Sequence, residues 1–323
     1  LVFGQITFET KMTSDGFMGM GAFESTTKTY LIENAQKTET KLKFTGAIMK
    51  MFSPKGTVTN IIRLDKELIW DFDDRKKNYT ERTFDEIRKT FDEYGQAGYA
   101  RQMQPSSSSE EDYEVEYEWS KPVVKVKNLK KTKTINGFNC QHYLASVTTV
   151  GTHLETGIKD TMLFAADLWN AKNVSKKMDL VNDFNKRYMN AIGFDLPENQ
   201  GLAMIAGMYK EQMQTLTDEV SKLQGYPIIN DMKLTMTKNL LSVEEEAEEP
   251  EEESISLRDI QRNFGGLLRK KIMKDVVDKK AEKPKQSSVA ELFHMTTEVL
   301  GIVESSLVGE IFEVKKGYKL KKN

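Results

Sequence analysis

Apolar and polar residues alternate along much of the N-terminal third of the chain, and this period of two predicts a series of short β-strands. Turn-forming residues such as Ser53-Pro54-Lys55-Gly56 and Asp73-Asp74 separate the apolar runs between Tyr30 and Thr83. A further strand is predicted at residues 2–13. This ladder of strands indicates a sheet-based architecture, and it contains no recognisable catalytic constellation.

A second block of strands is predicted after the Ser-rich segment at residues 105–109. Its first strand has aromatic and aliphatic residues alternating with acids, at Tyr113, Val115, Tyr117 and Trp119. Asn136-Gly137 lies between two strand-like runs, which is a strong signal for a β-hairpin. More strands are predicted at 140–150, 156–167 and 228–241, and the chain closes with two, at 289–304 and 310–320.

Helices are predicted where the apolar spacing changes to three and four residues. The first carries Phe84, Ile87, Phe91 and Tyr94, and the second carries Val181, Phe184, Tyr188 and Ile192. Two more follow, at residues 202–223 and 257–272. Strands at both ends with helices in blocks predict an α+β fold, a curved antiparallel sheet capped by helices.

The same patterns divide the chain into four parts. Residues 1–241 are expected to form the main curved-sheet domain with its helical cap, and residues 242–256 a Glu-rich acidic linker. Residues 257–288 are interpreted as an inserted amphipathic helix with a Lys-rich linker. Residues 289–323 are then the C-terminal strands that complete the main sheet.

Charge and composition narrow the classes of partner. The net charge of −2 gives no general attraction to nucleic acid, and no run approaches the roughly 18 apolar residues of a membrane span. One cysteine and three scattered histidines predict neither a disulfide nor a Cys/His zinc site, so we expect no metal and no cofactor. The first residues, Leu-Val-Phe-Gly-Gln, are compatible with the tail of an apolar signal segment, and a periplasmic or secreted protein is the expectation.

Several phrases of the chain resemble an uncharacterised bacterial exported family, domain-of-unknown-function family 4412. They lie at residues 30–44, 68–81, 130–146, 223–236 and 296–319. The family typically ends in Phe-Glu-x-Pro-x-x-Tyr; here Phe312 to Tyr318 follow that pattern with Lys315 in place of proline. Such proteins are similar in organisation to the lipoprotein carriers LolA and LolB, a resemblance that implies a LolA-like half-barrel with an apolar cavity for acyl chains.

Cys140 and His142 share one face of a predicted strand and represent the only nucleophile–base pair that the pattern suggests. A small buried cysteine beside a histidine at the sheet edge is the favoured interpretation, so no catalytic residue is predicted. Asp71, Asp73 and Asp74 form an acidic cluster, but the glycine and glutamate of a calcium-binding EF-hand loop are missing, and a solvated turn is favoured.

Candidate ligand contacts are the soft apolar residues outside the strands. Gly16, Gly19 and Gly21 indicate a mobile loop, and its Phe17, Met18 and Met20 are suited to contact a lipid or a partner. Met204, Met208 and Met213 follow one predicted helix and suit an adaptable cavity, although an ordinary core is the simpler reading of any single methionine. The basic face of the helix at 257–280 suits either solvent or an anionic membrane surface.

The combined prediction is a non-enzymatic exported protein that binds a lipid, an acyl chain or a lipoprotein inside a helix-capped half-barrel. The alternative is a structural or protein-interaction module of the cell envelope, with a filled core and an envelope protein as partner. The two differ in one property, whether the concave face of the sheet encloses a cavity.

Overall fold

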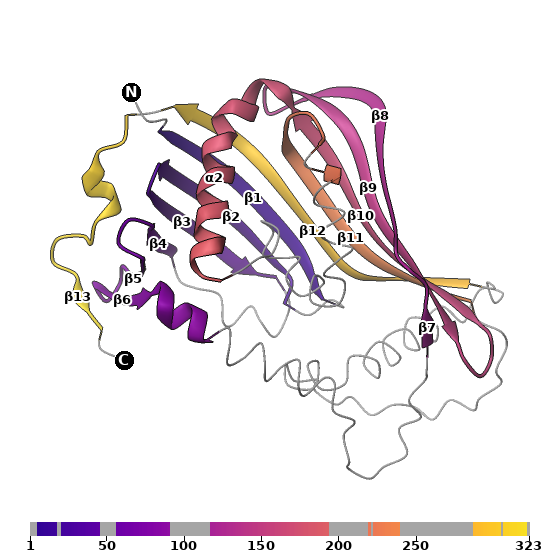
Figure 1. Ribbon diagram of the computed structural model, residues 1–323. Coiled ribbons are helices and arrows are strands. Elements are labelled where there is room, and N and C mark those ends of the chain that lie inside the picture. The colour runs from indigo at the N-terminus through magenta and orange to yellow at the C-terminus, as the bar shows by residue number, and fades with distance from the viewer. Residues whose placement is uncertain are drawn as a thin grey trace, which may run out of the picture.

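The computed structural model describes residues 5–17, 21–45, 56–90, 117–193, 219–220, 222–239, 287–304 and 306–321. These residues form one open, curved sheet of thirteen strands (Figure 1). The strand order is β13-β6-β5-β4-β3-β2-β1-β12-β11-β10-β9-β7, and β8 pairs with β9 beside β7. All neighbours are antiparallel except β13 and β6, which are parallel. The large antiparallel sheet with helices agrees with the predicted α+β class.

The predicted ladder of N-terminal strands is confirmed as a meander in which each strand pairs with the next. The strands are β1 (Ile6–Phe17), β2 (Phe23–Ile32), β3 (Ala35–Phe44), β4 (Thr57–Arg63), β5 (Leu68–Asp73) and β6 (Asn78–Thr83). Alternate side chains of a strand point to opposite faces. In β4 and β5 both faces carry buried residues: Ile62 and Ile69 pack with the helices, and Ile61 and Trp70 pack in a separate cluster with Phe312.

The second block contains β7 (Tyr117–Trp119), β8 (Val123–Ile135), β9 (Phe138–His153), β10 (Lys159–Ala171) and β11 (Tyr226–Asn239). Asn136 and Gly137 both have positive φ, at 49° and 82°, which is the conformation of the predicted two-residue hairpin turn. The tip of this hairpin bends over the end of the sheet: Asn136 Nδ2 donates to Glu298 Oε1 and to the Val299 carbonyl, both at 2.9 Å. The long β8–β9 hairpin therefore covers one end of the curved sheet.

The last long strand, β12 (Ser287–Glu304), lies between β1 and β11 and joins the two blocks. The prediction of a second C-terminal strand at 310–320 is wrong for most of its length. That segment contains a 3-10 turn, η4 (Gly309–Phe312), and only Lys319–Leu320 pair with the sheet, as β13. We call residues 306–321 the C-terminal strap, because Phe312 and its apolar neighbours pack across the outer face of β3 to β6.

Two α-helices lie over the concave face of the sheet (Figure 1). The first spans residues 84–90, and the second, α2 (Ser175–Ala191), follows a 3-10 turn, η2 (Lys172–Val174). The described part of each predicted apolar face is packed: Phe84 and Ile87 join Val181 and Phe184 in one buried cluster against β1, β2, β4 and β5, with Tyr188 partly buried beside them. Among the described residues, no helix has the length and apolarity needed to cross a membrane.

Other predicted segments lie outside the described residues. They are the end of the first helix at Phe91 and Tyr94, the start of the alternating strand at Tyr113 and Val115, most of the helix at 202–223, the acidic linker at 242–256, and the helix and linker at 257–288 up to residue 286.

Candidate functional site: the concave apolar face

A continuous apolar cluster lies on the inner side of β9, β10, β11 and β12, beside the part of the sheet that α2 covers. We call it the concave apolar face. Its members are Tyr143, Ala145, Val147, Met162, Phe164, Ala166, Leu168, Met232, Leu234, Met236, Ala290, Leu292 and Met295. β9, β10 and β11 contribute alternate residues, because successive side chains of a strand point to opposite faces. β12 contributes Ala290, Leu292 and Met295, with an irregularity in its pairing at Leu292.

Small and flexible side chains meet in the middle of this face. Ala145 lies opposite Ala166, Ala166 lies opposite Met232, and Met232 lies opposite Met295. The row thus places two methyl groups beside two thioether chains, which adapt to irregular shapes more readily than branched side chains do. The row therefore has short side chains on β9 and β10 and flexible side chains on β11 and β12.

Further residues border the concave apolar face, among them the buried polar residues Thr149 of β9 and Asp160 of β10. Val220 and Leu223 pack against it, as does Met12 from β1. Asn230 lies on the same side of β11 as Met232, and its Oδ1 is buried without a hydrogen-bond partner in the described part of the chain. A buried acceptor of this kind is free to receive a hydrogen bond from a bound molecule.

Most residues predicted to touch a ligand lie outside the described parts of the structure. These are Met18, Met20, Met204, Met208 and Met213. Phe17 is the last residue of β1, opposite Phe293 of β12, and only its backbone is described. The predicted contacts therefore remain predictions.

The sequence reasoning missed four methionines that the sheet brings together, Met162, Met232, Met236 and Met295. A signal for two of them was present. The run Met232-Lys-Leu234-Thr-Met236 alternates apolar and polar residues, which places three long apolar side chains on one face of a strand. The other two are recognisable only from the register of the strands.

Cys140 and His142 have separate partners in the structure. Cys140 is 2% exposed, its Sγ donates to the Phe138 carbonyl, and burial raises the pKa of its thiol, which opposes formation of a thiolate. His142 stacks on Trp169, with ring centroids 4.2 Å apart, and its Nε2 lies 2.8 Å from both oxygens of Asp167. The favoured interpretation of Cys140 as a buried residue agrees with this geometry, but the placement of His142 at the sheet edge is wrong, because β9 lies between β8 and β10 and His142 is buried.

The three predicted acidic residues also have separate roles, with Asp71 and Asp73 in β5 and Asp74 in the turn that follows it. Asp71 accepts hydrogen bonds from Asn60 Nδ2 and Arg82, and Asp73 accepts from two backbone N–H groups of its own turn. Asp74 accepts from Lys315 and Tyr318 of the C-terminal strap. Each carboxylate has its own partners in the protein, and no shared metal position follows from them.

Comparison of the chain with protein-family models and with curated proteins gives no match. The resemblance to family 4412 and to the lipoprotein carriers therefore stays a prediction drawn from the sequence.

Proposed function

We propose that this protein binds a hydrophobic ligand, an acyl chain of a lipid or lipoprotein, against the concave apolar face. The observation that carries the proposal is the Met-rich and Ala-containing surface on the inner side of a curved sheet. Each methylene group that such a surface removes from water contributes about 0.8 kcal/mol. An acyl chain therefore gains enough from burial alone to bind without a network of polar contacts.

The unpartnered Oδ1 of Asn230 adds an expectation about the polar end of the ligand. A hydroxyl or protonated carboxyl group that enters this side of the sheet has a buried acceptor available to it. The same proposal includes two further points. One is the half-barrel architecture that the LolA-like resemblance implies, and the other is export to the cell envelope.

The alternative, an interaction module with a filled core, predicts a different response to one substitution. Ala166→Leu adds bulk in the centre of the concave apolar face. If a ligand occupies this region, the added side chain fills its place, so affinity for a fluorescent fatty acid falls at least tenfold while the ligand-free protein keeps its stability. If the core is filled, the larger side chain of Ala166→Leu has no space, and the substitution lowers the free energy of unfolding by about 1–3 kcal/mol.

Ala35→Leu is the matched control, because Ala35 is 1% exposed in the separate cluster beneath the C-terminal strap. We expect it to destabilise the protein without changing fatty-acid affinity. Native mass spectrometry of the full chain purified from cells supplies the second measurement. A co-purified lipid that is lost in Ala166→Leu supports the proposal, whereas no lipid and no fatty-acid binding by the unmodified chain contradicts it.

A further inference from the structure

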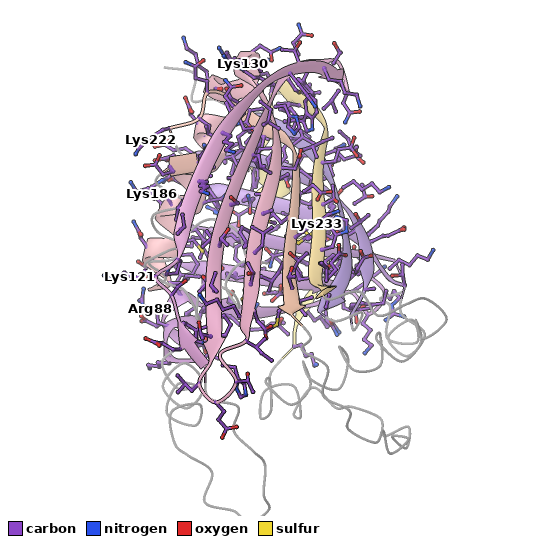
Figure 2. All side chains as sticks on the ribbon, turned by 90° about the vertical axis from the view of Figure 1, so that its right-hand side faces the viewer. Arg88, Lys121, Lys130, Lys186, Lys222 and Lys233 are labelled. Carbon is purple, nitrogen blue, oxygen red and sulfur yellow. The ribbon has the colours of Figure 1, made fainter. Side chains whose placement is uncertain are left out.

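A second site lies on the convex face of the sheet, on the side opposite the concave apolar face. Asp15 of β1 and Glu291 and His294 of β12 bring one ligand atom each to within 4.8 Å of the others. Figure 2 views the sheet from its right-hand side in Figure 1 and labels Lys233, which is directly opposite His294 on the neighbouring strand β11. Asp15 is far from Glu291 and His294 in the sequence, and the pairing of β1 with β12 brings it beside them.

Two irregularities in the strands aim these side chains at one point. β1 has one extra residue, Asp15, between Ser14 and Gly16, and Gly16 has a positive φ of 73°. β12 has one extra residue, Leu292, between Glu291 and Phe293, so that Glu291 and His294 share the convex face although they are three residues apart. β-Bulges that redirect a side chain are frequent next to functional sites.

The distances suit a metal ion. His294 Nδ1 lies 3.1 Å from Asp15 Oδ2 and 3.8 Å from Glu291 Oε1. A tetrahedral ion with bonds of 2.0–2.2 Å separates its ligand atoms by about 3.3–3.6 Å, between these two values. Imidazole nitrogen combined with carboxylate oxygen favours a transition metal over Mg²⁺ or Ca²⁺, which prefer oxygen alone.

The far side of the histidine ring has the partner that metal-binding histidines normally have. His294 Nε2 lies 3.1 Å from Asp231 Oδ2, and that carboxylate also accepts a hydrogen bond from the Thr296 hydroxyl at 3.0 Å. A metal-ligating histidine almost always gives its second N–H to such a group, which fixes the ring and its tautomer. With Nε2 as the donor to Asp231, the Nδ1 lone pair faces the carboxylate oxygens of Asp15 and Glu291. A bound cation between these three atoms removes the repulsion between the lone pair and the negative oxygens.

We propose that Asp15, Glu291 and His294 bind a divalent transition-metal ion such as Zn²⁺, with water at the fourth position and Asp231 as the residue that positions His294. The ion links β1 to β12, the strands through which the two halves of the sheet meet. Lys233 stands beside the site and repels a dication, so Lys233→Ala is expected to raise the affinity.

Isothermal titration calorimetry of the EDTA-treated full chain with Zn²⁺ tests this. We expect one ion per chain, bound at least tenfold more weakly by His294→Ala and by Asp15→Asn. Asp15 has a 71% exposed side chain, so its variant is expected to fold normally. Asp231→Asn is expected to weaken binding 10- to 100-fold without changing the melting temperature of the metal-free protein. His153→Ala, at the distant end of β9, is the control and should bind as the unmodified chain does.

Two results would overturn the proposal. One is the absence of Zn²⁺ binding, which would leave a proton as the cation between His294 and its carboxylates. The other is binding that Asp15→Asn and His294→Ala leave unchanged, because the ion would then be held elsewhere, for example by the glutamates of residues 244–253.

Discussion

Gly225 occupies a position where both the backbone conformation and the surroundings exclude a side chain. Its φ is +94°, and a Cβ atom would lie 2.8 Å from the Ala171 carbonyl carbon and 3.1 Å from the Lys172 nitrogen. Both neighbours are backbone atoms at the junction of β10 and η2, so they have little freedom to withdraw. Gly225 therefore allows β11 to begin directly beside the end of β10.

Gly225→Ala is expected to lower the free energy of unfolding by about 3 kcal/mol, because it adds the strain of a positive φ to a clash with backbone. Gly56→Ala is the matched control, since Gly56 has a similar φ of +103° but no atom within 4 Å of the added Cβ. That variant carries the strain alone, about 1–2 kcal/mol. Urea unfolding followed by far-UV circular dichroism measures both, and equal losses would contradict the role of the close approach.

The C-terminal strap is attached to the sheet by the buried side chain of Phe312 and by two groups of ion pairs and hydrogen bonds. Phe312 is 1% exposed and packs with Ile61 and Trp70. Glu313 forms ion pairs with Arg63 and, at 2.8 Å, with Lys66. Further along the strap, Lys315 and Tyr318 bind Asp74 at 2.8 and 2.5 Å. The strap is therefore attached to the turns that follow β4 and β5.

These ion pairs predict a loss of stability in acid. Burial alone raises the pKa of Asp74, but the hydrogen bonds from Lys315 and Tyr318 lower it more, so the net pKa lies below the ordinary 3.8. Glu313 behaves likewise: burial raises its pKa, but Lys66 and Arg63 bring it below 4.5. When the pKa of a carboxylate is lower in the folded state than in the unfolded state, its ionised form stabilises the fold. This stabilisation is complete above the unfolded-state pKa and is lost as the pH falls through the folded-state pKa.

Asp74→Asn combined with Glu313→Gln should therefore destabilise the protein more at pH 6 than at pH 3. Both side chains are more than a third exposed, so solvent limits the effect to about 1 kcal/mol per pair. Urea unfolding at pH 6 and at pH 3 measures the loss of stability. Glu155→Gln, in an exposed turn, is the control and is expected to leave the stability unchanged at both pH values. A difference between variant and unmodified chain that is the same at both pH values would contradict the prediction.

Elements set by short-range patterns were predictable, and those set by register were not. Asn136-Gly137 requires a tight turn wherever it occurs, so the β8–β9 hairpin followed from the sequence. Residues 310–320 were predicted as a strand, yet Phe312 and Tyr318 pack against the outer face of the sheet and only Lys319–Leu320 pair with a strand. The cluster of Asp15, Glu291 and His294 depends on two bulges, which no spacing along the chain reveals.

At the scale of the whole molecule, the sheet depends on a strand from the end of the chain. β12 pairs with β1 over residues 6–17 and with β11 over residues 229–239, and no other described strand joins the two blocks. It also contributes Ala290, Leu292 and Met295 to the concave apolar face. Long-range pairing of this kind makes the folding of the sheet slow and strongly cooperative.

Two truncations of the chain separate the contributions of β12 and of the strap. A chain that ends at residue 305 keeps β12 and loses the strap, so we expect it to unfold cooperatively at a lower denaturant concentration. A chain that ends at residue 286 exposes the edges of β1 and β11 and loses the apolar side chains that β12 contributes to the concave apolar face. We expect it to bind the dye ANS, to lose its near-UV circular dichroism and to show no cooperative urea transition. If the shorter chain instead unfolds in one sharp transition with the midpoint of the longer one, the two blocks are independent folding units and β12 only connects them.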